Sequence, residues 1–144
     1  MAGLRRELGG TLVLDAEGLV KLSSGDPTAR SHAQQAHNRG ATVVMAASTL
    51  AEVLRGGTRD ARLHRVLSRV TVIAVGQQQG RAAGELLGRT GLSGHRCALD
   101  ALVAVVALAR PRPVILLTSD TSDMARLTEE PGRARADRIR VSRV

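Results

Sequence analysis

Short apolar runs typical of buried β-strands alternate with helix-like segments along this chain, and this alternation constrains its fold more than any other feature. The strand-like runs cover residues 11–15, 41–46, 70–75, 114–118 and 138–144. The segments between them predict helices over residues 26–39, 48–54, 58–67, 77–89, 97–110 and 121–130. Strands that alternate with helices form parallel sheets covered on both faces. The sequence therefore predicts an α/β fold, a three-layer α/β/α sandwich around a central, mostly parallel sheet.

The length of 144 residues fits one domain with a substantial hydrophobic core. We expect residues 1–10 to form an N-terminal tail that ends at a Gly-Gly pair, and residues 11–144 to form a single domain. The stretch MAGLRRELGG lacks the apolar segment of a secretory signal, and no apolar run is long enough to span a membrane. Cys97 is the only cysteine, which favours a small core residue in a reducing, cytoplasmic setting.

The formal net charge of +8 indicates polyanionic partners. Almost all basic residues are arginine, with Lys21 as the single lysine. The chain contains no Phe, Tyr or Trp, so it has no aromatic platform on which bases could stack. Any nucleic acid would have to be held through its backbone charge and through a metal ion.

Five carboxylates fall at positions where an unpaired charge is costly. Asp15 closes the first strand, Glu52 and Asp100 lie within apolar helix-like runs, and Asp120 and Asp123 follow the fourth strand. Burial of an unpaired charge costs several kcal/mol, and a divalent cation is a common way to neutralise such a group. Ligands bind at the carboxyl ends of parallel strands, so we expect these side chains to converge at one edge. Hard oxygen ligands at such an edge favour Mg²⁺ or Mn²⁺ and chemistry on phosphates.

Four phrases, LVLDAEGL, STLAEVLRGG, ALDALVAVVALA and LLTSDTSDMARL, occur in an order and at separations that resemble the PIN-domain nucleases. The chain is most similar to toxins of the VapC type from bacterial toxin–antitoxin pairs. The resemblance implies that Asp15, Glu52, Asp100 and Asp120 are catalytic. With Asp123 as a fifth carboxylate, these residues would hold one or two Mg²⁺ or Mn²⁺ ions.

The resemblance further implies a metal-dependent endoribonuclease that hydrolyses RNA phosphodiesters as the toxin of a type II pair. Its partners would be RNA, a cognate antitoxin and a second copy of the chain in a homodimer. Thr118 and Ser119, just before the fourth carboxylate, are weaker candidates for contacts with RNA. So are His95 and Arg96, which we expect in the loop that precedes the central helix. Glu17 departs from the family pattern, which favours a small polar or neutral residue at this position.

Several of these carboxylates also have purely structural interpretations. The segment Thr49-Leu-Ala-Glu52 has the pattern of a capping box, in which Glu52 would bind a backbone amide. Asp120 could cap the helix that follows it, and Asp15 could form a turn. Asp100 is the hardest to explain in this way, because it is the only polar side chain between Ala98 and Ala109.

Other phosphate-handling folds fit the sequence less well. The residues after Asp15 lack the glycine fingerprint of a dinucleotide site, and no P-loop is present. Receiver and dehalogenase-like folds keep a lysine late in the chain, where this sequence has none. A different alternative is a catalytically inactive, basic RNA- or partner-binding module of the same fold, using the arginine-rich segment 132–144. That segment could equally be an edge strand whose charges prevent aggregation.

Overall fold

The computed structural model of this chain describes residues 9–144, which contain five strands. These are β1 (Thr11–Leu14), β2 (Thr42–Ala46), β3 (Thr71–Ile73), β4 (Val114–Thr118) and β5 (Arg140–Arg143). They form one sheet in the order β3-β2-β1-β4-β5, and all of its pairings are parallel. All five predicted strands are therefore confirmed, although β3 is shorter than predicted. The arginine-rich β5 lies at an edge of the sheet, as its alternating charges indicate.

Seven α-helices connect these strands in the described part of the chain. They are α2 (Ala16–Ser23), α3 (Pro27–Asn38), α4 (Thr49–Val53), α5 (Ala61–Leu67), α6 (Gln77–Thr90), α7 (Gly94–Leu108) and α8 (Thr121–Leu127). Short 3-10 helices cover Thr58–Asp60 and Arg135–Asp137. The predicted helices are all present, but the strand and helix pattern does not predict α2. Two local signals for α2 are the capping carboxylate of Asp15 and the buried Leu19 one turn into the helix.

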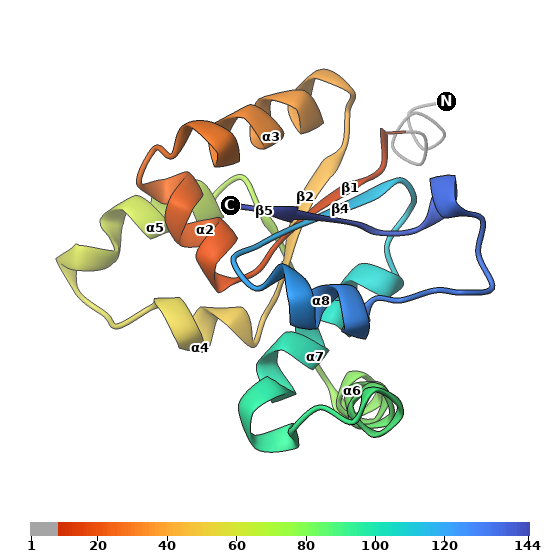
Figure 1. The fold of residues 1–144 in the computed structure, drawn as a ribbon. Coiled ribbons are helices and arrows are strands. Elements are labelled where there is room, and N and C mark those ends of the chain that lie inside the picture. Colours follow the sequence, from red (N-terminus) through yellow and green to blue (C-terminus); the bar gives the residue numbers. More distant parts are fainter. Residues whose placement is uncertain (1–8) are drawn as a thin grey trace.

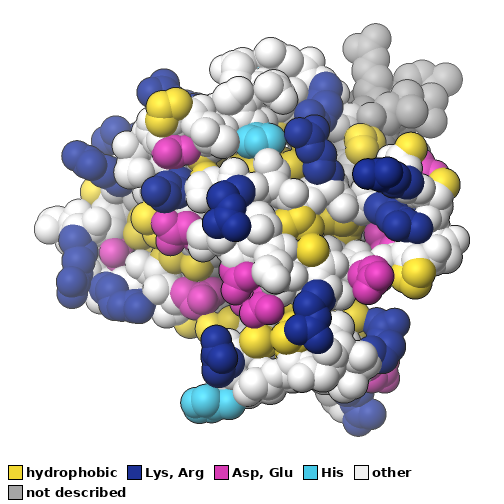
Figure 2. All heavy atoms as spheres, in the orientation of Figure 1, with side chains coloured by type: hydrophobic (Ala, Val, Ile, Leu, Met, Phe, Trp, Pro, Cys, Tyr) yellow, Lys and Arg dark blue, Asp and Glu magenta, His cyan; other side chains and the backbone are white. Residues whose placement is uncertain are grey.

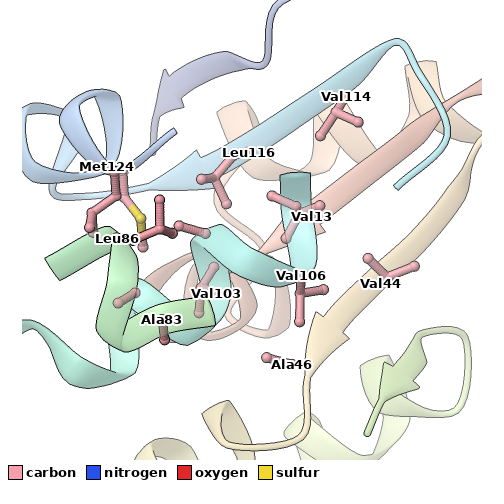
Figure 3. Packing of buried hydrophobic residues seen from close by; sticks show 14 residues of the cluster. Val13, Val44, Ala46, Ala83, Leu86, Val103, Val106, Val114, Leu116 and Met124 are labelled. Carbon is pink, nitrogen blue, oxygen red and sulfur yellow. The ribbon is translucent and has the colours of Figure 1, made fainter. Parts of the chain in front are cut away.

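The helices form two layers, one on each face of the sheet (Figure 1). Leu12 and Leu14 of β1 belong to a core cluster shared with apolar residues of α2, α3, α4 and α5. Val13 points to the opposite face, where its cluster includes residues of α6, α7 and α8. Figure 3 shows this second cluster, in which Val13 and Leu116 of the sheet face Val103 and Val106 of α7. The predicted three-layer α/β/α sandwich is confirmed.

The strand order places β1 in the middle of the sheet and brings the predicted site to one edge. The chain moves outward from β1 to β2 and β3, and then returns to the other side of β1 for β4 and β5. The order therefore reverses between β1 and β4, and crevices for ligands form at the carboxyl ends of strands beside such a reversal. Asp15 follows β1 directly, and Asp120 lies two residues after β4.

Helix α7 differs in two respects from the predicted central helix. It begins at Gly94 rather than at residue 97, because the Ser93 side chain caps it by accepting a hydrogen bond from the Arg96 amide at 3.4 Å. Its residues from Cys97 onward are almost all apolar, which favours burial on every side, but Leu99 is 40% exposed whereas Ala101 is fully buried.

The two glycines before β1 are part of the packed domain. Gly9 and Gly10 are both buried, and a Cβ atom on Gly10 would lie 2.2 Å from the carbonyl oxygen of Pro113. The expected tail is therefore wrong for these two residues, and its residues 1–8 lie outside the described residues. In the described part, no single helix is long and apolar enough to cross a membrane; α6 and α7 would satisfy the criterion only as a pair bent by 118°.

Candidate functional site

Asp15 is fixed at the junction of β1 and α2. Its Oδ1 atom accepts a hydrogen bond from the Gly18 amide at 2.8 Å, so Asp15 is the N-cap of α2. The side chain is 7% exposed. Burial raises the pKa of this carboxyl, while hydrogen bonds from the Thr118 side chain and the Gly18 amide oppose the increase. The predicted turn-forming role is thus real, and it leaves a buried carboxylate at the carboxyl end of the central strand.

Asp120 and Asp123 lie at the start of α8. The Asp123 amide donates a hydrogen bond of 3.1 Å to Oδ1 of Asp120, which confirms the predicted capping interpretation for Asp120. The Asp120 amide in turn donates to the buried Thr118 hydroxyl at 3.0 Å. Oδ2 of Asp123 accepts a weak hydrogen bond of 3.8 Å from the thiol of Cys97, a buried residue of α7. These contacts connect α8 to both β4 and α7.

Asp100 lies in the second turn of α7 and shows the strongest electrostatic signature in the site. Its pKa is raised to about 6, first by burial and then by the negative charges of Asp15, Asp120 and Asp123. Two carboxylates close enough to repel each other favour the protonated form of one of them. The raised pKa of Asp100 therefore reports that carboxylates from β1, α7 and α8 share one region of the molecule.

Glu52 lies on α4, the helix that follows β2, and its capping-box interpretation is wrong. Thr49 is the first residue of α4 rather than its N-cap, and the actual N-cap residue, Ser48, makes no side-chain capping bond. The pKa of Glu52 is raised by burial and by the charges of Asp100 and Asp15. Glu52 therefore belongs electrostatically to the same group as the other carboxylates.

The described cations do not neutralise this group. Among residues 9–144, none of Asp15, Glu52, Asp100, Asp120 and Asp123 forms an ion pair; the ion pairs present there join Glu130 to Arg112 and to Arg133. Figure 2 shows acidic side chains gathered on the face where α4, α7 and α8 lie in Figure 1, with basic side chains around them.

The chemistry of these donors fits a divalent cation, although the side chains are not drawn together around one. No three His, Cys, Asp or Glu side chains within residues 9–144 are grouped closely enough to hold a metal ion as they stand. Burial and then repulsion between carboxylates raise the pKa of Asp100 and Glu52, and a bound cation would relieve the repulsion. In addition, Ser48 Oγ and Thr49 Oγ1, at the start of the helix that carries Glu52, are buried without a hydrogen-bond partner in the described structure. Buried polar atoms of this kind commonly contact water or an ion.

The weaker candidates take different positions. Thr118 is buried within the group, and Ser119 is exposed directly before Asp120. His95 and Arg96 do not lie in a loop, as expected, because the early start of α7 places both in its exposed first turn. Glu17 is half-buried in the first turn of α2, and its charge contributes to the raised pKa of Asp15.

Sequence reasoning missed Gly18, whose amide holds Asp15 in place. The available signal was its position three residues after a capping carboxylate.

A separate groove of 870 Å³ lies between α3, α5 and the first residues of β2 and β3. None of the predicted site residues lines it, and the charged side chains that do are Arg30, Arg62, Arg65 and Arg69. The groove is at the amino ends of these strands, opposite the edge with the carboxylates. Four arginines therefore line a groove at the end of the sheet opposite the acidic group.

The fold resembles that of solved bacterial proteins at low sequence identity. A crystal structure of VapBC2 from Rickettsia felis bound to a DNA fragment from their promoter contains a chain with a TM-score of 0.64 and 19% identity, and the match covers 93% of this chain and 98% of that one. A toxin–antitoxin complex from Klebsiella pneumoniae matches with a TM-score of 0.60 and 22% identity over 89% of this chain and 99% of that one. No curated protein matches the sequence significantly.

The family model of the PIN domain matches residues 12–130. This range contains all five carboxylates, from Asp15 to Asp123, and it covers most of the chain. The family that the sequence phrases resemble is thereby confirmed: the chain belongs to the PIN domain family.

Proposed function

We propose that this protein is a metal-dependent endoribonuclease that hydrolyses RNA phosphodiesters with Mg²⁺ or Mn²⁺. The observation that carries the proposal is the electrostatic coupling of Asp15, Glu52, Asp100, Asp120 and Asp123 at one edge of the sheet without a described cation paired to them. Membership of the PIN family supports a nuclease. The net charge of +8 supports a polyanionic substrate.

In this proposal the side chains of Asp15, Glu52, Asp100 and Asp120, with Asp123, hold one or two ions. When bound, Mg²⁺ or Mn²⁺ supplies a water of lowered pKa and neutralises charge on the phosphate. The protein contributes position: β1 and α2 fix Asp15, and the cap of α8 fixes Asp120. Capping uses Oδ1 of each carboxyl, so Oδ2 of Asp120 accepts no hydrogen bond from the described residues and remains available as a ligand.

Thr118, Ser119, His95 and Arg96 are the residues we propose for contacts with RNA near this edge. Ser119, His95 and Arg96 are exposed, whereas Thr118 is buried and acts through its hydrogen bond to the Asp120 amide. No aromatic side chain is available for stacking. RNA would therefore be held through its phosphates and sugars.

We further propose that the protein acts in the cytoplasm as the toxin of a type II toxin–antitoxin pair, as a homodimer that a cognate antitoxin neutralises. Two observations support this role. The sequence phrases resemble VapC-type toxins, and the two similar structures are those of a VapBC pair and of a toxin–antitoxin complex.

The decisive experiment incubates the purified protein with total cellular RNA in Mg²⁺ or Mn²⁺, beside an EDTA control. Asp100→Asn removes one proposed ligand, and Asp137→Asn makes the same chemical change on an exposed aspartate elsewhere. We expect discrete RNA fragments from the wild type and from Asp137→Asn, and none with EDTA or from Asp100→Asn. Tight RNA binding without cleavage under every condition would instead support a catalytically inactive binding module.

A further inference from the structure

Arg143 on β5 lies at the same sheet edge as the carboxylates. In the parallel register of β4 and β5, Arg143 is level with Thr118, the last residue of β4. Its guanidinium donates hydrogen bonds to the Ser119 carbonyl at 3.1 Å and to the Thr121 hydroxyl at 3.0 Å. Ser119 and Thr121 flank Asp120 in the chain, so this guanidinium is held next to one proposed metal ligand.

The alternation of β5 places Arg143 on the face of the sheet that α8 covers. Val141 packs against the core cluster shared with α6, α7 and α8, whereas Val144 packs against the cluster on the opposite face. Side chains two residues apart in a strand share a face. The side chain of Arg143 therefore lies on the same face as that of Val141, and its hydrogen bond to Thr121 of α8 agrees with this placement.

The guanidinium of Arg143 retains donors that are not used by any residue from 9 to 144. Arginine has five N–H donors, and two of them are engaged here. The residue is exposed, and it forms no ion pair with any of residues 9–144, although aspartates lie close by. A positive charge is thus fixed in orientation with donors free toward solvent.

We propose that Arg143 binds a phosphodiester of the RNA strand adjacent to the carboxylates, an inference that rests on the proposed ribonuclease function. A guanidinium recognises phosphate oxygens through two parallel hydrogen bonds, which gives both attraction and orientation. The carboxylates repel the RNA backbone, so a fixed cation at their border supplies attraction where the strand must approach. The bonds to Ser119 and Thr121 tie the position of that phosphate to Asp120.

The test measures the dissociation constant of a labelled single-stranded RNA in an Asp100→Asn background, where no cleavage interferes. Arg143→Gln should weaken binding roughly tenfold and reduce the slope of log K against log salt by about 0.7, the share of one phosphate contact. Arg143→Lys should weaken binding but keep the salt slope, because the charge remains while the paired hydrogen bonds are lost. Arg140→Gln is the matched control, since Arg140 is an exposed arginine on the same strand but on its other face.

Equal affinities and salt slopes for Arg143→Gln, Arg140→Gln and the parent would overturn the inference. The inference would also be overturned if Arg143→Gln lost binding to poly-glutamate but kept its binding to RNA, because the site would then recognise an acidic protein segment.

With Asp100 restored, Arg143→Gln should raise KM in Mn²⁺ far more than it changes kcat. If the wild type fails to cleave any RNA, the proposed function fails, whereas the binding measurements still decide the role of Arg143. Thermal melts of each variant show that it is folded.

Discussion

The backbone amide of Gly18 donates a 2.8 Å hydrogen bond to Oδ1 of Asp15 while Gly18 itself lies against β4. A Cβ atom at Gly18 would be 3.0 Å from the carbonyl oxygen of Leu117 and 3.5 Å from Oδ1 of Asp15. The missing side chain therefore allows α2 to pack closely on the sheet and allows its first turn to hold the carboxylate. The position of Asp15 depends on this contact between a helix and a strand.

Gly18→Ala should lower both stability and activity. Alanine favours a helix over glycine by about 0.5–1 kcal/mol, but at this position its methyl group must displace Leu117 or α2, and overpacking costs about 1–3 kcal/mol. Gly84→Ala on α6 is the control, because no atom lies within 4 Å of a Cβ there. We expect the control to melt at or above the wild-type temperature and Gly18→Ala to melt below it. A Gly18→Ala protein as stable and active as the control would contradict the role of this close contact.

The stability of the metal-free protein should depend on pH through Asp100. Its pKa is raised from 3.8 to about 6 in the folded state, so between these values the folded protein binds the proton more tightly than the unfolded chain does. The free energy of unfolding therefore decreases as the pH rises through this window, and Asp100→Asn removes this effect. In EDTA, the two proteins should melt at similar temperatures near the lower value, and the variant should melt higher at neutral pH. If the melting temperatures of the two proteins changed in parallel across this pH range, the raised pKa of Asp100 would be contradicted.

Divalent cations should stabilise the wild type by relieving the same repulsion. A ligand present at about 100 times its Kd adds roughly 2.7 kcal/mol to the free energy of unfolding. Differential scanning fluorimetry at neutral pH should show a higher melting temperature in millimolar Mg²⁺ or Mn²⁺ than in NaCl of equal ionic strength. The increase should shrink in Asp15→Asn and persist in Asp137→Asn. A melting temperature that changes with neither metal would exclude a metal site of useful affinity at this edge.

Overproduction in a bacterial host without an antitoxin should slow growth, because cleaved RNA cannot support protein synthesis. Asp100→Asn should remove this effect and Asp137→Asn should retain it. Growth curves after induction, together with immunoblots that show equal protein levels, provide the measurement. Equal growth inhibition by wild type and Asp100→Asn would show that toxicity does not depend on the carboxylates.

Sequence patterns predicted the strands, their parallel arrangement and the two helical layers, because these follow from local periodicity. The start of α3 is also set by local sequence, because Pro27 is its first residue and Asp26 accepts the capping hydrogen bond from the Ala29 amide at 3.0 Å. Helix α2 was not predicted, because it has only eight residues and only half of them are apolar. Its stability comes from packing on β4 and α5.

The carboxylates could be named from the sequence, but their local bonds could not. The pattern Thr49-x-x-Glu52 fits a capping box, yet the chain turns into α4 one residue earlier, so Thr49 lies inside the helix. Arg143 gave no sequence signal beyond its charge, because its contacts with Ser119 and Thr121 arise only when β5 pairs with β4. Such contacts depend on which strands pair in the folded protein, and the local sequence does not encode that pairing.

The central position of β1 also has a consequence for the timing of synthesis. Asp15 leaves the ribosome long before the neighbour of its strand, β4, and the carboxylate of Asp120. The pairing of β1 and β4 joins residues as far apart in the chain as Thr11 and Val114, a contact of the kind that forms late in folding. A nascent chain that ends before β4 therefore has no assembled acidic edge, and whatever chemistry that edge performs can begin only after residues 114–123 have been synthesised.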